Sequence, residues 1–542
     1  MIYILFSFLL IFPILMGFGK LFQNYFGSLW NGISGQLVSG IILLMVVWHL
    51  LAFFSPINFY VELISVLIGF FLFFYYQSYR IFLNFDRKNG FLWLISILIS
   101  SLVGSGYPFI LDHFGYYVPS IKWIAEFGLV RGITNLDWVL GQMSPWHIFQ
   151  AGFSHFSDPF LRINTLVLGV FFLYIMEKKS WAMLCFSPIL FLFVQSPSPD
   201  LPVIVFSLMI LNEILQKNRQ FSLLFAFSVL VFSIKPTMFW LPMLTFFYPI
   251  FIFKQNLKFI GWGAFLSVLY IVKNLWVFGY PFFPMEVIDL DISWKPYDAL
   301  FTESKEIAVL KTFDLQYTLE EIAQFSTGEY IWNWLFLKGI KGIINLGLIF
   351  SLVVFGIYTI RKGNLLITLV FTCILAKTLF VLWFSAQYRF FIEVFFVIFI
   401  ILFRNIFTKK HSLILFSILS LGSVGLLFFP NVLKANIPSF HLGSVMKGFE
   451  LKQIYKPSHY VFNRYSTHKL GNLTFNVPQN YIFGFDVALP VITLSSLEEF
   501  ETLGFFPQLK GEALQDGFIW KKLENREKQQ LRLMIEKIKE EK

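Results

Sequence analysis

Long runs of apolar residues recur along most of this 542-residue sequence. A helix needs roughly 17–25 such residues to cross the hydrocarbon core of a bilayer. Runs near this length lie at 2–18, 37–54, 59–77, 91–108, 160–176, 181–195, 201–215, 220–234, 237–253, 258–278, 343–360, 364–384, 390–404 and 412–429. Hydrophobic residues make up 57% of the chain and charged residues 14%, more apolar surface than a water-soluble fold can bury. The sequence therefore predicts an all-α polytopic membrane protein with about 14 transmembrane helices.

Basic residues are distributed unevenly between the two sets of alternate connections. One set carries Lys20; Arg80, Arg87 and Lys88; Lys178 and Lys179; Lys217 and Arg219; Lys254; Arg361 and Lys362; Arg404, Lys409 and Lys410. The opposite short connections, "SPIN" and "QSPSPD", contain no Lys or Arg. Because cytoplasmic loops are enriched in Lys and Arg, this asymmetry predicts that the basic set is cytoplasmic. It also accounts for the net charge of +10 without a nucleic-acid partner.

The same alternation places the segments 109–159 and 279–342 and the C-terminal tail outside the cytoplasm. The tail differs in composition from the rest. "GNLTFNVPQNYIFGFDVALPVITL" mixes β-branched and aromatic residues with turn formers and predicts short strands. "NREKQQLRLMIEKIKEEK" favours a charged helix. We therefore expect a membrane bundle at 1–430, with external loops 109–159 and 279–342, and a small extracytoplasmic α+β domain at 431–542.

Ionisable residues gather at the outward ends of the predicted helices. These are Asp112, Asp200, Lys235, Lys273 with its neighbour Asn274, and Arg389. Each alone has a structural explanation as a helix cap, an ion-pair partner or a snorkelling lysine. Together they place two carboxylates and three cations on one side of the membrane, where ionisable groups mark functional sites and cations suit a lipid-linked phosphate. Lys377 and Glu393 lie deeper and are predicted to form a structural pair between adjacent helices.

Several segments resemble a known group of enzymes. The first external loop reads Asp112, Tyr116, Tyr117, Ile121, Lys122, Trp123, and is followed by Gly132, Asn135 and Leu136. Later come "SPSPDLP", "NLWVFGYPFFP", "QYRFF" and "LKGEALQDGFIW". In this order they resemble an uncharacterised bacterial membrane-protein family of the GT-C superfamily of membrane glycosyltransferases, although Tyr117 replaces an expected His.

The resemblance implies a GT-C-like bundle in the bacterial inner (cytoplasmic) membrane. It would transfer a sugar from a polyprenyl-phosphate donor to a glycan, lipid or protein acceptor on the extracytoplasmic face. Asp112 would be the catalytic base, and Asp200 a second carboxylate that orients the acceptor or a metal. Arg389, Lys235 and Lys273 would neutralise the departing phosphate. The further substrate-binding residues would be Tyr116, Tyr117, Lys122, Trp123, Asn135 and Asn274. Carboxylate oxygens also suit a divalent cation, Mg²⁺ or Mn²⁺, but the sequence has no compact ligand cluster and we assign no cofactor.

Two other functions stay open. A polysaccharide polymerase or ligase uses similar substrates and would employ the long 279–342 loop. A transporter or flippase of lipid-linked glycans would place its charges at the membrane midplane and often has internal repeats, whereas here the charges lie on one side and no repeat is evident.

Overall fold

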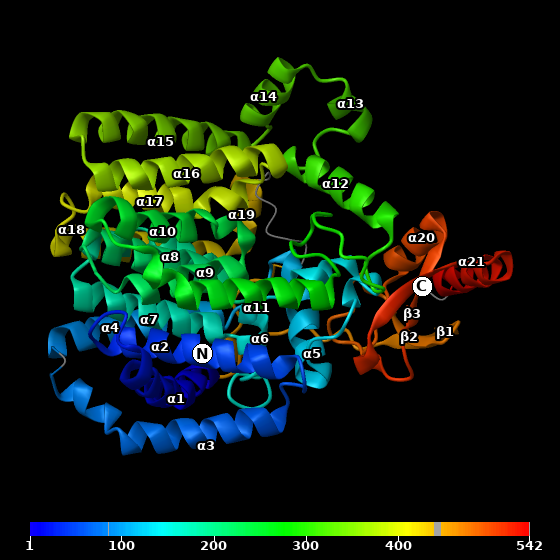
Figure 1. The fold of residues 1–542 in the computed structure, drawn as a ribbon, viewed down its shortest axis with the longest axis horizontal. Coiled ribbons are helices and arrows are strands. Elements are labelled where there is room, and N and C mark those ends of the chain that lie inside the picture. The colour runs from blue at the N-terminus through cyan, green and yellow to red at the C-terminus, as the bar shows by residue number, and fades with distance from the viewer. Residues whose placement is uncertain (85, 438–445, 541–542) are drawn as a thin grey trace.

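The computed structural model describes residues 1–84, 86–437 and 446–540. The chain is mostly helical, and its long helices lie side by side (Figure 1). The helices up to residue 277 are α1 (Ile2–Phe26), α2 (Ile33–Ala52), α3 (Phe59–Tyr75), α4 (Arg87–Gly104), α5 (Val118–Phe127), α6 (Pro145–Ala151), α7 (Ile163–Lys178), α8 (Asp200–Leu215), α9 (Phe221–Ile234), α10 (Trp240–Phe253) and α11 (Gly261–Val277).

The later part of the chain adds a helical external segment, four more long helices and the tail. Its helices are α12 (Asp298–Thr312), α13 (Leu319–Ala323), α14 (Thr327–Leu335), α15 (Ile340–Lys362), α16 (Leu365–Phe384), α17 (Ile392–Phe403), α18 (Lys409–Phe428), α19 (Pro430–Asn436), α20 (Leu494–Leu503) and α21 (Asn525–Glu540). The short 3₁₀ or π turns are η1 (Ser78–Asn84), η2 (His113–Tyr117), η3 (Ile133–Asn135), η4 (Trp138–Gln142), η5 (Trp181–Cys185), η6 (Ser187–Phe193), η7 (Pro236–Met238), η8 (Leu257–Ile260), η9 (Tyr388–Phe391), η10 (Leu451–Ile454) and η11 (Leu514–Asp516).

Seven helices among the described residues are long and apolar enough to cross a membrane. They are Ile2–Phe26, Ile33–Ala52, Pro236–Phe253, Leu257–Val277, Ile340–Lys362, Leu365–Phe384 and Lys409–Phe428. The helices Phe59–Tyr75 and Phe221–Ile234 are apolar but shorter. The chain is therefore a multi-pass membrane protein by its helices, and the predicted number of 14 spans is not reached by this criterion.

The predicted helix at 181–195 is replaced by the two short 3₁₀ helices η5 and η6. Pro188 stands in the first turn of η6, and proline has no backbone N–H to donate to an α-helical ladder. It also disfavours the α conformation in the residue before it. The apolar run at 181–195 therefore correctly indicated a largely buried segment, but this segment is not a regular α-helix.

The loops that the charge pattern assigns to one side lie close to one another. Lys409 Nζ donates to Asn89 Oδ1 at 3.0 Å and lies 4.6 Å from the centre of the Trp181 ring. Asn218 Nδ2 donates to Leu29 O at 2.8 Å. These two sets of contacts involve connections from five parts of the chain.

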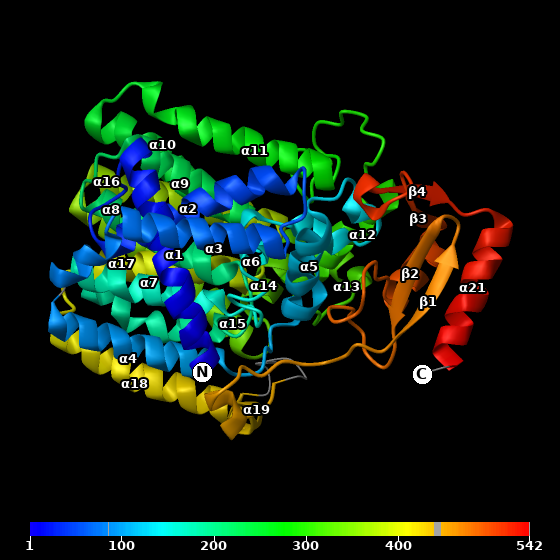
Figure 2. The ribbon, with the colours of Figure 1, turned by 90° about the horizontal axis from the view of Figure 1, so that it is seen from below.

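The three predicted external segments meet in the same way. Phe518 N in the tail donates to Arg131 O at 2.9 Å, and Trp520 Nε1 donates to Lys295 O at 3.1 Å. Figures 1 and 2 both show α5, α12 and the tail gathered at one end of the bundle. The first external loop, the 279–342 segment and the tail therefore form one layer at that end.

The tail forms the small sheet region expected from its sequence. Strands β1 (Tyr465–Leu470) and β2 (Leu473–Pro478) pair antiparallel, as do β3 (Phe505–Leu509) and β4 (Phe518–Lys522). Helix α21 packs Leu531, Ile535 and Ile538 inward and exposes its charged residues, in agreement with the prediction of a charged terminal helix.

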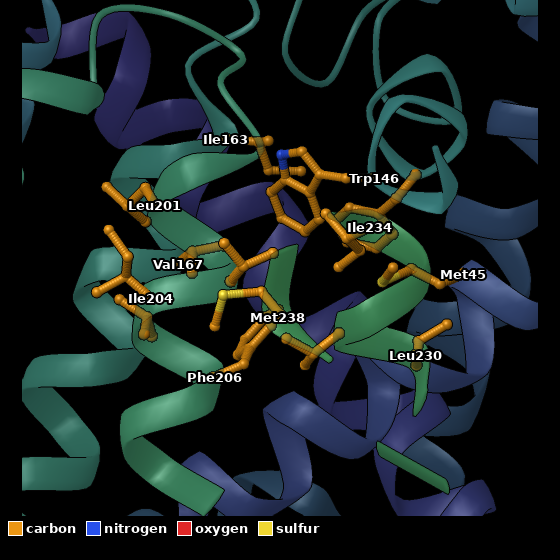
Figure 3. Packing of buried hydrophobic residues seen from close by; sticks show 14 of the residues in the cluster. Met45, Trp146, Ile163, Val167, Leu201, Ile204, Phe206, Leu230, Ile234 and Met238 are labelled. Atoms are coloured by element: carbon orange, nitrogen blue, oxygen red, sulfur yellow. The ribbon is translucent and has the colours of Figure 1, made fainter. Parts of the chain in front are cut away.

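A close-packed apolar core lies beneath this layer. Figure 3 shows Trp146 of α6 and Leu201 of α8 pointing toward one another, with Ile234 of α9 and Met238 of η7 beside them. All four side chains are nearly inaccessible to solvent. Close packing of this kind fixes the ends of α6, α8 and α9 relative to one another, and those ends carry the polar residues described next.

Candidate active site

A cavity of about 370 Å³ lies where α8, α9, α11 and α16 have the ends that face the tail. Its wall is contributed by segments far apart in the sequence. Among the residues predicted for a site, seven line this cavity: Tyr116, Tyr117, Asp200, Lys235, Lys273, Asn274 and Arg389. The structure thus brings together residues that the sequence analysis selected from five separate helix ends.

Asp112 does not line the cavity itself, but it contacts Arg389, which does. Arg389 Nη1 donates to Asp112 Oδ2 at 2.5 Å, and Arg389 Nε donates to Gln387 Oε1 at 3.1 Å. Burial, the largest single influence, lowers the pKa of Arg389, but Asp112, Tyr117, Tyr116 and Asp200 together outweigh burial and raise that pKa above its ordinary value. Within the part of the chain that is described, no hydrogen bond reaches Asp112 Oδ1 or Arg389 Nη2. Both atoms remain available to a substrate.

This pairing changes the roles expected from the sequence. There, Asp112 was an isolated base and Arg389 a phosphate ligand. In the structure the guanidinium directly contacts the carboxylate, so the two side chains form one ion pair. Of the two structural alternatives for Asp112, the helix cap does not hold, because its side chain caps no backbone N–H of η2, whereas the ion pair is present, with Arg389.

Asp200 forms a second ion pair, with Lys235. Asp200 begins α8 and is buried, and its Oδ2 also accepts a hydrogen bond from Ser198 Oγ at 3.0 Å. The Tyr117 hydroxyl lies 3.5 Å from Ser198 Oγ. A polar chain therefore runs from the first external loop to Lys235 along the cavity wall.

Phe390 connects the two ion pairs. The centre of its ring lies 5.2 Å from the Arg389 guanidinium carbon and 5.0 Å from Lys235 Nζ. Both cations thus face one aromatic ring, a contact that stabilises positive charge. The two carboxylates and their cations are held as one assembly around the turn η9.

Two tyrosines complete the polar wall. Burial, followed by the Asp112 carboxylate, raises the pKa of Tyr116 well above its ordinary value. Burial, followed by Tyr116, does the same for the pKa of Tyr117. Both phenols therefore stay protonated and can donate hydrogen bonds to a ligand oxygen.

Lys273 is a third cation in the cavity wall and has a different environment. Its side chain is 3% exposed, and Nζ donates to Met143 O at 2.7 Å. No carboxylate among the described residues forms an ion pair with it. Its neighbour Asn274 donates to Pro281 O at 2.8 Å. A buried ammonium group without an anionic partner is unfavourable, so an anion in the cavity would satisfy it.

Three predicted site residues lie elsewhere and hold the external layer together. Lys122 Nζ donates to Val487 O at 2.7 Å in the tail, rather than pairing with Glu126. The Trp123 ring packs 5.8 Å from the ring of Phe518. They do not line the cavity with the other predicted residues, because partners distant in sequence occupy their side chains.

Asn135 belongs to the same group. Its Nδ2 donates to Trp294 O at 2.8 Å and to Gly132 O at 3.2 Å. Gly132 has φ 58° and a side chain there would meet Phe518 O at 2.4 Å, which explains the glycine in "GLVRGITNL" by close backbone approach. Asn135 therefore fastens the first loop to the 279–342 segment.

The sequence analysis missed the contribution of α12. Ser304, Ile307, Ala308 and Lys311 all line the cavity. They follow the i, i+3, i+4, i+7 spacing that places residues on one helix face. This periodicity was present in the sequence and would have identified a helix that covers the site. Lys311 also lines an adjoining cavity of about 110 Å³.

The turn that carries Arg389 is held by this external segment. Ala386 N donates to Thr312 Oγ1 at 3.1 Å, and Trp334 Nε1 of α14 donates to Ala386 O at 3.0 Å. Ser385 Oγ donates to Ala308 O at 3.3 Å. The position of the Arg389 side chain thus depends on α12 and α14 as well as on its own helix.

Lys377 and Glu393 form an ion pair between α16 and α17, and both are buried. The predicted structural role of this pair is confirmed in its geometry. Lys377 Nζ also donates to Phe390 O at 2.5 Å, so the pair supports the turn beneath the two ion pairs of the cavity.

The residues that the structure describes contain no group of three or more His, Cys, Asp or Glu side chains placed to hold a metal ion. A family model described as "Domain of unknown function (DUF8201)" matches residues 1–396. All the cavity residues named above lie within this match. No curated protein and no solved structure matches the chain.

Proposed function

This chain belongs to the DUF8201 family of domains of unknown function, and we propose that it is an integral-membrane glycosyltransferase. It transfers a sugar from a polyprenyl-phosphate donor to an acceptor hydroxyl in the bacterial cell envelope. The observation that carries this proposal is the convergence of the ion pairs Asp112–Arg389 and Asp200–Lys235 and the unpaired Lys273 at one cavity.

Charge supports an anionic substrate. The cavity wall carries Lys235, Lys273, Lys311 and Arg389, and the carboxylates of Asp112 and Asp200 pair with only two of these cations. The remaining positive charge suits a phosphate group, and fixed cations stabilise developing negative charge better in a site with little water.

The apolar part of the wall supports a lipid-linked substrate. Phe380 and Phe384 of α16 line the cavity, and 52% and 46% of their surfaces are exposed. Helix α16 is one of the apolar membrane-length helices. The cavity therefore borders a surface that would face lipid, where the hydrocarbon chain of a polyprenyl carrier is soluble.

The residues account for each step of transfer. Asp112 Oδ1 accepts the proton of the acceptor hydroxyl, and the acceptor oxygen forms a bond to the anomeric carbon. The bond between that carbon and the phosphate oxygen breaks, and the lipid phosphate leaves with the electron pair. Lys273, Lys311 and Arg389 Nη2 stabilise the charge on the departing phosphate, while Asp200 orients the acceptor through its position on the polar chain.

The basic connections support the orientation. Since Lys and Arg are enriched in cytoplasmic loops, the cavity at the opposite end of the bundle would face the extracytoplasmic side of the bacterial inner membrane. A cavity at one end of the helices is less suited to a transporter, whose site lies near the midplane.

The experiment uses the full chain in nanodiscs. The donors are undecaprenyl-phosphate-linked sugars with a radiolabel in the sugar, supplied one at a time. The acceptor is an extract of envelope glycans and lipids. We expect label to move to the extract with release of undecaprenyl phosphate. The Asp112→Asn variant should abolish this, and the Asp291→Asn variant is the control, since Asp291 is exposed outside the cavity. Absence of release with every donor would refute the proposal.

A polysaccharide polymerase or ligase is the second candidate. It is favoured by the face of α12 that lines the cavity, Ser304, Ile307, Ala308 and Lys311, which we call the stripe of α12. This stripe comes from the 279–342 segment, the long late loop in which such enzymes would carry their chemistry. The labelled product separates the two candidates on a gel. A single added sugar indicates the glycosyltransferase, and a ladder or a transferred long chain indicates the polymerase or ligase.

A further inference from the structure

Helix α14 has two faces with different surroundings. Trp334 is buried and donates through Nε1 to Ala386 O. Trp332 is 63% exposed and Ile331 is 55% exposed. Two residues apart on a helix means a rotation of about 200°, so Trp332 points away from the protein contacts that Trp334 makes. Phe336 is 47% exposed just beyond the helix and its ring lies 4.2 Å from that of Trp332.

These exposed side chains continue an apolar stripe of the neighbouring membrane helix. The exposed large hydrophobic residues of α15 are Ile343, Leu346, Ile349, Phe350, Val353, Ile357 and Ile360, and Arg361 and Lys362 at its end are also exposed. The spacing of these hydrophobic residues, mostly three or four positions, places them on one face. Helix α15 is long and apolar enough to cross a membrane, so this face is the one that contacts lipid. Only four residues separate the ends of α14 and α15, and the apolar surface passes from one helix to the other.

The direction of α14 differs from that of α15. Figure 1 shows α14 at the end of α15 that lies toward α12, turned across the direction of α15 and projecting to the side of the bundle. A helix turned across a membrane-spanning helix at its end lies along the membrane surface. An aromatic and aliphatic face on such a helix is typical of the interface between headgroups and acyl chains.

The charged residues near α14 lie outside its apolar face. Glu329 stands in the first turn, where it accepts hydrogen bonds from Ser326 in a capping box. Lys338 follows the helix and is exposed. Basic residues near a bilayer surface are attracted to lipid phosphates. The exposed face itself carries no charged residue between Tyr330 and Phe336.

We propose that α14 is an interfacial helix whose face of Ile331, Trp332 and Phe336 inserts into the bilayer surface on the side of the tail. Trp334, about 200° around the helix from Trp332, binds the turn at residues 385–389 through Ala386 O. Helix α14 thereby links the membrane surface to the turn that carries Arg389. This inference does not depend on which reaction the cavity performs.

The experiment places a nitroxide at Ile331→Cys and, separately, at Phe336→Cys, in the full chain in nanodiscs. The native Cys185 and Cys373 are buried and leave the introduced thiol as the accessible one. Asp291→Cys is the matched control, because its carboxylate is exposed in the same external segment. The measurement is the ratio of collision rates with oxygen, which concentrates in lipid, and with a water-soluble nickel chelate.

We expect this ratio to be several-fold higher at both α14 positions than at Asp291→Cys. Equal ratios at all three positions would overturn the proposal by placing α14 in water. Low collision rates with both reagents at the α14 positions would also overturn it, since a protein partner would then cover this face. Two label positions guard against failure of either variant to fold.

Discussion

Arg389 Nη1 lies 2.5 Å from Asp112 Oδ2, although 277 positions separate the two residues in the chain. The pair joins the first external loop to the turn before α17. It also joins a candidate base to a candidate phosphate ligand. Any change to one partner therefore alters the position and the electrostatic surroundings of the other.

Replacing Asp112 by Asn tests the base. The amide keeps the shape of the side chain but accepts no proton at neutral pH, so transfer should fall by about 10²–10⁴-fold. The protein should remain folded, because Asn still accepts a hydrogen bond from Arg389. Initial rates of sugar release, with a thermal unfolding curve for each variant, measure both quantities. Transfer at the wild-type rate would remove Asp112 from the reaction.

Replacing Arg389 by Ala tests the second partner. Loss of a hydrogen bond to a charged group should raise the KM for the lipid-phosphate donor by about 10- to 100-fold. Because the two residues contact each other, the effects of Asp112→Asn and Arg389→Ala should not add in the double variant. A double-mutant cycle on kcat/KM measures this coupling. Strict additivity would show that the ion pair is separate from the chemistry.

Replacing Lys273 by Met tests whether the buried cation serves a ligand. The ammonium group has no carboxylate partner among the described residues, so folding gains little from its charge. We expect an unchanged or higher unfolding temperature and weaker inhibition of the proposed sugar transfer by inorganic pyrophosphate. The matched control is Lys341→Met, since Lys341 pairs with Asp314 and lines only the adjoining smaller cavity. Equal inhibition of wild type and Lys273→Met would contradict the role in anion binding.

The pair Lys377–Glu393 provides a contrast in which charge supports the fold. Removing one partner of a buried ion pair leaves an uncompensated charge and costs about 3–5 kcal/mol. Lys377→Met should therefore lower the unfolding temperature strongly. The double variant Lys377→Met with Glu393→Leu removes both charges and should recover much of the loss. Unfolding in detergent measures both, and a double variant as unstable as the single one would argue against the pair.

The sequence was sufficient to identify the helix ends that converge on the cavity. It did not reveal which ion pairs their side chains form. Asp200, Lys235, Lys273 and Arg389 were predicted because each is an ionisable residue at or near the outward end of an apolar run, and that rule needs no tertiary information. Which carboxylate meets which cation depends on how the helices pack, and no local pattern contains it.

Lys122 and Asn135 show the opposite case. Both were expected at the site because they belong to the segments that resemble the GT-C enzymes. Their partners, Val487 and the backbone of Trp294, are 365 and 159 positions away, so the sequence could not reveal that they fasten external segments together. The stripe of α12 was different, since its helical spacing was present in the sequence and was overlooked.

The contact between α12 and the tail should depend on pH. Glu499 of α20 hydrogen-bonds with Glu303 of α12, and burial, followed by Glu303 and then Asp137, raises the pKa of Glu499 to about 8. Glu303 and Asp137 are the charged groups that face it, and both are acidic. The ordinary pKa of a glutamate is 4.5. Between these two values the folded state binds a proton that the unfolded state has lost, so stability falls as the pH rises.

We therefore expect the docking of the tail to be firmest below pH 4.5 and to weaken up to about pH 8, where Glu499 ionises beside Glu303. Glu499→Gln should remove this slope, so that at pH 8 the variant is more stable than wild type. Hydrogen exchange of α12 and α20 at pH 5, 6.5 and 8 measures docking directly. Glu498→Gln is the control, because Glu498 pairs with Lys539 instead, and it should keep the wild-type slope. A slope that persists in Glu499→Gln would assign the pH response to another group.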